Sequence, residues 1–282
     1  MSVHQKTFSV LMSVYFKETV SNLEQSILSI INQTLPPNEI VLVKDGPLTL
    51  ELDNRINDFK IQYPNLFKII ELPENKGLGN ALAIGLTHCT YDIVARMDTD
   101  DIAVNNRFEK QLNFLSKHPE IDVLGCNIEE FNSFPGDLKR FKINPQNHEA
   151  LIEQIKLKSP FNHPSIVFKK NAILNAGNYD GSLPLFEDYS LFLRLMLTGA
   201  HFYNLQEYLL FFRVKDGVET IKRRSGVHYL RKELKFVNFA VKIGAFSKLD
   251  RLVYVTLKFP VRLLPPKVAL FVYNTFLRKS SK

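Results

Sequence analysis

The chain has 282 residues, of which 45% are hydrophobic, and it carries a formal net charge of +7. That length and composition predict one large domain with a sizeable core, followed by a tail. Its two cysteines, Cys89 and Cys126, form no pattern, which argues against a disulfide framework or a zinc site and suits a reducing cytosol. No cationic stretch followed by an apolar core opens the chain, so a secretory signal is not expected.

The amino-terminal half alternates short apolar runs with segments of helical periodicity. The expected strands are 8–15, 39–43, 68–72 and 91–95, and the expected helices are 22–31 (capped by Ser21 or Asn22), 81–87 and one that begins near Asn105. This alternation predicts a mostly parallel sheet with helices on both faces. Three strands end in polar residues, at Tyr15, at Asp45 and at 98–101. Because such strand ends meet at one edge of the sheet, a nucleotide is expected there.

The densest group of charges is Arg96-Met97-Asp98-Thr99-Asp100-Asp101, which directly follows the fourth expected strand. So many carboxylates are costly unless water, a cation or a partner charge compensates them. Oxygen ligands suit Mg²⁺ or Mn²⁺, and such a metal usually keeps sites free for substrate phosphates. The group therefore indicates a metal-dependent site for a nucleoside diphosphate. The alternative is an acidic turn that caps the helix near Asn105.

Six segments together resemble a known family. They are 9–15, 33–34, 39–46, 75–82, 96–101 and 186–189, in that order along the chain. Residues 7–215 resemble a family 2 glycosyltransferase of the nucleotide-diphospho-sugar transferase (GT-A) fold, in particular the bacterial enzymes of capsule, exopolysaccharide and lipopolysaccharide assembly. The resemblance implies transfer of a sugar from a nucleotide-diphosphate sugar, with UDP as the expected nucleotide, to a hydroxyl of a glycan or lipid-linked acceptor. It also implies Mg²⁺ or Mn²⁺ as cofactor.

On the donor side, the resemblance assigns Tyr15 and Asp45 to the uracil or other base. It assigns Asp98 and Asp100 to the metal and diphosphate, with Asp100 as the more direct ligand. The alternatives are an ordinary aromatic at a strand end for Tyr15 and an Asx turn with Gly46 for Asp45.

A second group of donor contacts is basic. Arg96 fits a clamp on phosphate or carboxylate, because its planar fork matches either group. Many members of the family carry an Arg-Asn pair where this chain has Ala81-Leu82. That departure puts the contact of the missing arginine in doubt, and Lys76 or Arg96 would substitute for it.

On the acceptor side, Glu187 and Asp188 precede residues at helical spacing and so stand at a helix start, where a capping role is the alternative. Transfer needs a base for the acceptor hydroxyl, and the resemblance assigns it to Asp188, with Glu187 orienting the acceptor. One base and no enzyme nucleophile imply direct displacement with inversion. The resemblance also makes His163 an acceptor or diphosphate contact, or else a histidine satisfied by its loop. Arg213 would reach the diphosphate, or else pair with a surface acid.

Charge is distributed unevenly along the chain. Residues 1–207 hold 19 Lys and Arg against 25 Asp and Glu, a net of −6, whereas residues 208–282 hold 17 against 4, a net of +13. The basic part also carries apolar residues between 249 and 277, in runs too short to span a bilayer. Basic amphipathic segments lie at the membrane interface and favour anionic lipid. The alternatives are a helix that packs on the catalytic domain and, less favoured by the apolar content, a nucleic-acid surface.

The expected organisation follows from these points. Residues 1–215 form a GT-A catalytic domain, with a nucleotide-sugar half at about 7–125 and an acceptor half at 126–215. Residues 216–282 form a basic, amphipathic, helical carboxyl-terminal region. The expected location is the cytoplasm, on the inner face of the cell membrane, with no nucleic-acid partner.

Two other classes of function remain open. A sugar nucleotidyltransferase also uses a carboxylate pair and Mg²⁺, but it usually has a glycine-rich phosphate loop after the first strand, where residues 13–18 contain no glycine. A non-catalytic relative that only binds sugar nucleotide is the other class. The presence of Asp98, Asp100 and Asp188 argues against it.

Overall fold

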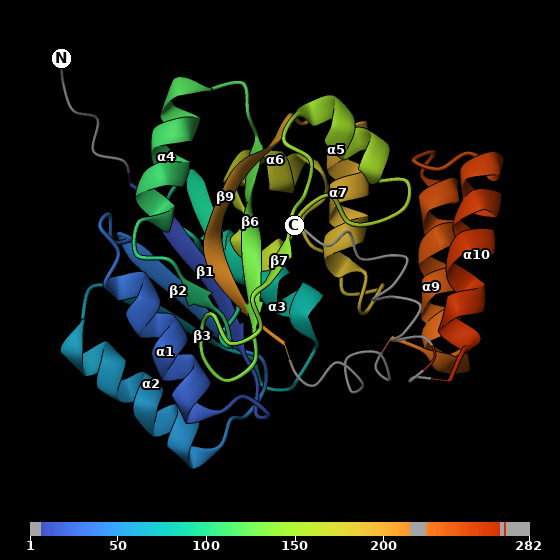
Figure 1. Ribbon diagram of the computed structural model, residues 1–282. Coiled ribbons are helices and arrows are strands. Elements are labelled where there is room, and N and C mark those ends of the chain that lie inside the picture. Colours follow the sequence, from blue (N-terminus) through green and yellow to red (C-terminus); the bar gives the residue numbers. More distant parts are fainter. Residues whose placement is uncertain (1–6, 215–223, 266–267, 269–282) are drawn as a thin grey trace.

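The computed structural model describes residues 7–214, 224–265 and 268. Within these ranges one sheet contains the strands β1 (Ser9–Val14), β2 (Glu39–Lys44), β3 (Phe67–Glu71), β4 (Ile93–Arg96), β5 (Ile102–Ala103), β6 (Val123–Phe131), β7 (Arg140–Lys142), β8 (Val167–Lys169) and β9 (Phe202–Arg213). The helices are α1 (Val20–Ile31), α2 (Leu50–Gln62), α3 (Leu78–His88), α4 (Arg107–Lys117), α5 (His148–Gln154), α6 (Lys170–Asn175), α7 (Glu187–Leu197), α9 (Gly226–Lys242) and α10 (Lys248–Leu263), with a short 3₁₀ helix η1 (His163–Ser165). Figure 1 shows the sheet at the centre of the molecule and α9 and α10 side by side at one end.

The strand order is β3-β2-β1-β4-β8-β6-β9-β5, and β7 is attached to β6. The first four strands in this order run parallel to one another. Strand β8 is antiparallel to both of its neighbours, and β6 and β9 are again parallel. The prediction of an α/β fold is confirmed. The four adjacent parallel strands are those of the amino-terminal half, in which the sequence alternates strands and helices. Beyond β4 the sheet is mixed.

Helices cover both faces of the sheet because successive residues of a strand point to opposite sides. Leu11 of β1 packs in one apolar cluster with Leu82 and Leu86 of α3. Its neighbours Val10 and Met12 pack in a second cluster, which α1, α2 and α4 complete. With both faces buried, the edge at the carboxyl ends of β1, β2 and β4 is where polar side chains meet.

Helix α1 starts closer to β1 than expected. Its cap is Thr19, whose hydroxyl accepts a hydrogen bond from the Asn22 amide at 3.2 Å, so the expectation of Ser21 or Asn22 as cap is wrong. The physical reason is position: of these three side chains, only that of Thr19 precedes the first turn of the helix, so its oxygen can accept from the free amides of that turn. Only residues 15–19 therefore connect β1 to α1, and this short connection holds Glu18 at the sheet edge. There the Glu18 carboxylate accepts a hydrogen bond from the Thr99 hydroxyl at 2.8 Å.

The two carboxyl-terminal helices pack on the rest of the protein. Phe236 of α9 stacks on Phe186 with ring centroids 4.8 Å apart and lies 4.5 Å from the ring of Tyr189 on α7. Helix α10 is attached to α9 through Glu233, which is fully buried and accepts hydrogen bonds from Tyr254 and Arg262. The described part of the basic region thus shares its core with α7, as the packing alternative expected. Residues 215–223, 266–267 and 269–282 of that region lie outside the described residues.

None of the helices in the described ranges combines the length and the apolar composition needed to cross a bilayer.

Candidate active site

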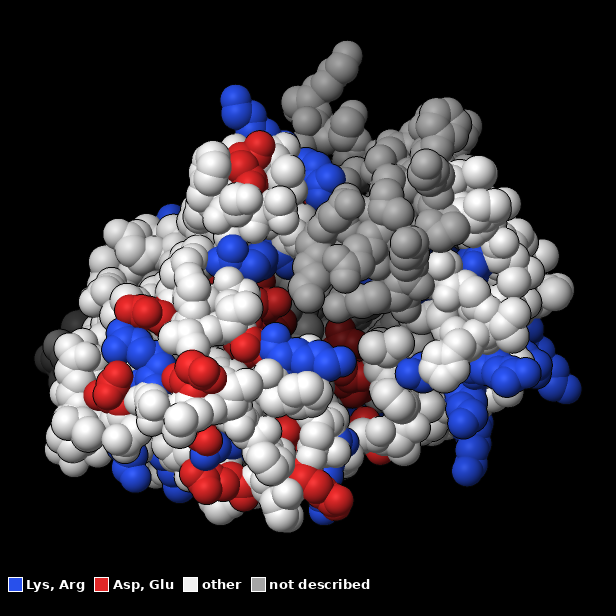
Figure 2. Space-filling model, turned by 90° about the horizontal axis from the view of Figure 1, so that it is seen from below, with Lys and Arg blue, Asp and Glu red and all other residues white. Residues whose placement is uncertain are grey.

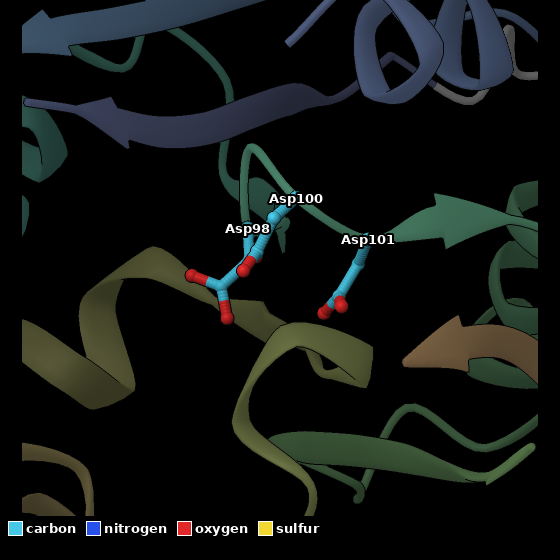
Figure 3. Close-up of side chains that lie close together, drawn as sticks. All are labelled: Asp98, Asp100 and Asp101. Carbon is cyan, nitrogen blue, oxygen red and sulfur yellow. The ribbon is translucent and has the colours of Figure 1, made fainter. Parts of the chain in front are cut away.

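Three carboxylates meet in the loop that follows β4. Asp98, Asp100 and Asp101 each offer an oxygen, and these oxygens all lie within 4.8 Å of one another. Figure 3 shows the three side chains directed from one loop toward a common space. Seen from below, the molecule has a hollow that holds acidic side chains, with Lys and Arg side chains around it (Figure 2).

The positive charge beside this cluster comes first from Arg96, the last residue of β4. Its side chain is only 1% exposed, and it forms an ion pair with Asp98. Two of its nitrogens, Nε and Nη1, are buried and have no partner among the described residues. Arg96 thus pairs with a carboxylate of the protein itself, and its guanidinium retains donors for a further anion.

One arginine does not neutralise three carboxylates. Desolvation, followed by the charges of Asp98 and Glu18, raises the pKa of Asp100 to about 7. Desolvation and the charge of Asp100 raise the pKa of Asp101 well above its ordinary value. The buried Oδ2 of Asp101 also has no hydrogen-bond partner among the described residues. Clustered carboxylate oxygens with an orphaned acceptor fit a hard divalent cation.

Arg213, at the end of β9, holds the acidic loop through hydrogen bonds. Its amide donates to Oδ1 of Asp101 at 2.8 Å, and its Nε donates to the Asp100 carbonyl at the same distance. Its guanidinium also donates to the Gln25 side chain at 3.0 Å and lies over the Phe131 ring. Within the described chain this network takes the place of the expected surface salt bridge. Arg213 therefore lies beside the predicted diphosphate site and holds the backbone of the loop.

Tyr15 and Asp45 lie next to each other because β1 and β2 are paired, and the Asp45 amide donates to the Val14 carbonyl at 2.8 Å. The Asp45 carboxylate accepts from the amides of Lys76 and Gly77 at 2.7 and 3.0 Å. The expected turn partner Gly46 is not its contact, so the Asx-turn alternative is wrong. Asp45 instead joins the end of β2 to the start of α3. Tyr15 is 42% exposed.

A separate structural requirement explains why residue 46 is a glycine. Its φ is +84°, and a Cβ there would lie 2.6 Å from the Asn75 amide nitrogen. The two loops can approach this closely only without a side chain at that position. Lys76 extends outward from the second loop, and its ammonium lies 3.6 Å from Glu74. Lys76 thus lies near the sheet edge at which the nucleotide is predicted, and its partner is the exposed carboxylate of Glu74.

Helix α7 begins with the predicted carboxylate pair. The Asp188 carboxylate accepts from the Tyr189 amide at 2.7 Å, so one of its oxygens pairs with an amide of the first turn, whereas the cap residue is Phe186 and makes no side-chain cap bond. Burial raises the pKa of Asp188. Desolvation and the neighbouring Asp188 raise the pKa of Glu187 to about 7, and Oε2 of Glu187 is buried without a partner among the described residues.

His163, in η1, is buried. Its Nε2 lies 3.0 Å from the Tyr179 hydroxyl, so its partner is this side chain and not the backbone of its own loop. Burial, then the charge of Arg96, moves its pKa well below the ordinary value, which leaves the ring neutral. Arg96 also interacts electrostatically with Glu187 and Asp188. Arg96 therefore pairs with the loop after β4 and also adds positive charge near the start of α7.

Sequence reasoning missed several members of this arrangement. Asp101 was part of the motif but was not assigned a role, and Glu18 and Gln25 carry no motif at all. Arg107 is fully buried and donates to the Arg96 carbonyl at 3.0 Å, yet its sequence context is that of an ordinary helix start. Only Asp101 had a signal in the sequence, namely its place in the acidic run.

Comparison with known proteins agrees with this architecture. Residues 9–175 match the model of the family described as Glycosyl transferase family 2, and the chain belongs to that family. It is 37% identical over 269 residues to the amylovoran biosynthesis glycosyltransferase AmsE of Erwinia amylovora, covering 95% of this chain and 98% of the relative. It is 36% identical over 279 residues, 99% of each chain, to the Escherichia coli enzyme named UDP-Gal:alpha-D-GlcNAc-diphosphoundecaprenol beta-1,3-galactosyltransferase.

The fold has counterparts among solved structures. The mannosyltransferase PcManGT from Pyrobaculum calidifontis, solved in complex with GDP-Man and Mn²⁺, superposes with a TM-score of 0.60 at 16% identity, covering 96% of this chain and 88% of the other. At that identity the likeness shows the GT-A fold alone. Together with the family match, it makes the protein a GT-A glycosyltransferase whose relatives include enzymes of bacterial polysaccharide synthesis.

Proposed function

We propose that the protein transfers a sugar from a UDP-sugar to a hydroxyl of a lipid-linked or other glycan acceptor, with inversion, in the synthesis of a bacterial surface polysaccharide. The observation that carries this proposal is the acidic group of Asp98, Asp100 and Asp101 beside buried Arg96, whose charge also acts on the carboxylates that begin α7. The nucleotide and the lipid-linked acceptor are inferred from the name of the Escherichia coli relative.

The donor lies along the carboxyl ends of β1, β2 and β4 in this proposal. The exposed ring of Tyr15 stacks on the uracil, and Asp45 receives a hydrogen bond from the ring edge. Asp98 and Asp100 hold Mg²⁺ or Mn²⁺, which supplies Lewis-acid compensation for charge on the departing diphosphate. Arg96 and Lys76 add positive charge, because Ala81-Leu82 provides none. Arg213 supports the site by fixing the loop of Asp100.

The acceptor hydroxyl approaches Asp188. Its proton passes to the free oxygen of that carboxylate while the hydroxyl oxygen bonds to the anomeric carbon and the bond to the UDP oxygen breaks. Glu187 orients the acceptor, and neutral His163 with Tyr179 forms the polar wall beside it. Because no enzyme group forms a bond to the sugar, a single displacement inverts the anomeric configuration.

Donor hydrolysis without acceptor tests the class of reaction. We expect slow release of UDP from one member of a panel of UDP-sugars in the presence of Mg²⁺ or Mn²⁺, because water can take the place of the acceptor. Liquid chromatography of the nucleotide products measures it. Formation of UTP and a sugar 1-phosphate when pyrophosphate is added to the UDP-sugar would identify a sugar nucleotidyltransferase instead, and binding of UDP without turnover of donor or acceptor would identify a non-catalytic relative.

The carboxyl-terminal region would place the enzyme on the inner face of the membrane. Apolar side chains of α10 face solvent, with exposed fractions of 61% for Leu252 and 57% for Leu257. Leu249, Val253 and Leu263 are also exposed and continue this row along the helix. Lys248 and Arg251 at its start add positive charge. The expected membrane contact at residues 269–279 lies outside the described residues.

Vesicle sedimentation tests this attachment. The full chain is expected to sediment with vesicles that contain phosphatidylglycerol at low salt and to be released as salt screens the lipid charge. Leu252→Ser with Leu257→Ser should weaken sedimentation, because the apolar face supplies depth in the interface. Leu50→Ser with Ile61→Ser, two exposed apolar residues of α2, is the matched control. Equal sedimentation of both double variants and the wild type would contradict a membrane role for α10.

A further inference from the structure

Thr99 stands between the two proposed metal ligands, Asp98 and Asp100, which Figure 3 shows close to one another in the loop after β4. The Thr99 side chain is buried, and its hydroxyl donates a hydrogen bond to Oε2 of Glu18 at 2.8 Å. The bond joins residues 81 positions apart in the sequence. The loop after β1 is therefore linked directly to the residue whose position governs how both carboxylates are directed.

The Glu18 carboxylate is itself fixed at the start of α1. Its Oε1 accepts from the Thr19 amide at 2.8 Å and from the Asn22 side-chain amide at 3.1 Å. One oxygen is thus held by the helix start, and the other is presented to Thr99. Among the described residues, the group of clustered carboxylate oxygens comprises residues 98, 100 and 101, and Glu18 lies outside it. The geometry is that of a bridge between α1 and the acidic loop.

Only a carboxylate can make this bridge in full, although its charge is unfavourable there. Both oxygens of a carboxylate accept hydrogen bonds, whereas a glutamine side chain has one acceptor oxygen and would face one of the two partners with a donor. Desolvation, then the charges of Asp98 and Glu18, raise the pKa of Asp100, so Glu18 adds repulsion to an already crowded acidic site. Its place beside that site is explained by the hydrogen bonds that it accepts.

The backbone on either side of Thr99 is held as well. The hydroxyl of Ser26, a buried residue of α1, donates to the Asp98 carbonyl at 2.8 Å, and Nε of Arg213 donates to the Asp100 carbonyl at the same distance. These two bonds fix the path of the chain at its flanks. The bond from Thr99 fixes the residue between them, so three consecutive residues of the loop are constrained by separate segments.

We propose that Glu18 is a positioning residue, which acts through Thr99 to hold Asp98 and Asp100 in the arrangement that binds the metal and diphosphate of the donor. The inference rests on the proposed function, since it takes these two aspartates as the metal ligands. Glu18 itself contacts neither metal nor sugar. Residues that hold metal ligands in place by hydrogen bonds typically contribute about 10- to 100-fold to metal affinity or activity.

The metal-dependent part of UDP binding tests this role apart from catalysis. Calorimetry on the full chain measures the Kd of UDP with saturating Mn²⁺ and with a chelator, and the ratio of the two values is the gain due to metal. Thr99→Val keeps the shape of the side chain without its hydroxyl and should reduce this gain about tenfold. Glu18→Ala should reduce it to the same extent. The double variant should lose no more than either single variant, because all three lack the same hydrogen bond.

Two further variants serve as controls. Thr99→Ser retains the hydroxyl and should retain the gain. Thr90→Val is the matched control, because the Thr90 hydroxyl donates to Glu39 at 2.6 Å in a contact of the same kind before the opposite end of β4, and its gain should equal that of the wild type. In Thr99→Val the Kd of UDP with chelator should stay the same. A hydrogen bond with a merely structural role would instead lower the unfolding temperature without metal and leave the gain intact.

Three results would each overturn the proposal: an unchanged gain in Thr99→Val, an equal loss in Thr99→Ser, or a double variant whose loss is the product of the two single losses. The last would show that Glu18 acts by a route other than Thr99. Failure of the proposed function is distinguishable, because the wild type would then show neither a gain due to metal nor turnover of a sugar nucleotide. Failure of the positioning role alone leaves both of these in place.

Discussion

Asp188→Asn is expected to lower kcat for transfer by about two to four powers of ten, the usual scale for loss of a general base. Asparagine keeps the size of the side chain and its acceptor oxygen for the Tyr189 amide, so α7 should retain its start. It cannot take the proton of the acceptor hydroxyl. Donor binding should be unchanged, because Asp188 contacts the acceptor side. Single-turnover transfer with saturating UDP-sugar measures the chemical step, and UDP titration measures donor affinity.

The neighbouring residue provides the control. Glu187→Gln, in the same helix turn, should cost clearly less than Asp188→Asn. Burial raises the pKa of Asp188, so in the wild type the rate should fall on acidification at a higher pH than for an ordinary aspartate, as the base becomes protonated. Residual activity of the asparagine variant should lose this acidic limb. Wild-type turnover of Asp188→Asn at neutral pH would show that another group is the base.

The sequence predicted the parts of the site that depend on short patterns. A strand such as β4 is recognisable from its apolar run, and the acidic residues that follow it must lie at the sheet edge. The carboxylate pair at 187–188 was placed at a helix start by the periodicity of the residues after it, and α7 begins at Glu187. Local order and the parallel pairing of β1, β2 and β4 sufficed to bring Tyr15, Asp45 and Asp98 to one edge.

Contacts between distant segments were beyond local reasoning. The Asp45 carboxylate binds amides of the loop before α3, and this contact depends on how two loops meet after the sheet has formed. Arg213 reaches the acidic loop only because β9 pairs with β5, a strand of two residues with no sequence signal of its own. Phe236 of α9 packs on α7, although charge alone suggested a separate basic tail. Tertiary packing decided each of these cases.

Asp100→Asn should abolish measurable transfer and the metal-dependent part of UDP binding. The substitution keeps the shape of the side chain but removes a carboxylate whose pKa desolvation and the charges of Asp98 and Glu18 raise. An amide is a poorer ligand for Mg²⁺ or Mn²⁺ than a carboxylate, so the cation should bind more weakly. Isothermal titration of UDP with and without Mn²⁺, together with transfer assays, measures both losses.

Thermal unfolding distinguishes this loss of a ligand from loss of the fold. Without metal, Asp100→Asn should unfold at the same or a higher temperature than the wild type, because one of several crowded, desolvated negative charges is gone. Addition of Mn²⁺ should raise the unfolding temperature of the wild type and have little effect on the variant. Asp92→Asn, an exposed carboxylate before the opposite end of β4, is the matched control and should behave as the wild type. Transfer that survives both Asp100→Asn and a chelator would mean that the acidic cluster is not a catalytic metal site.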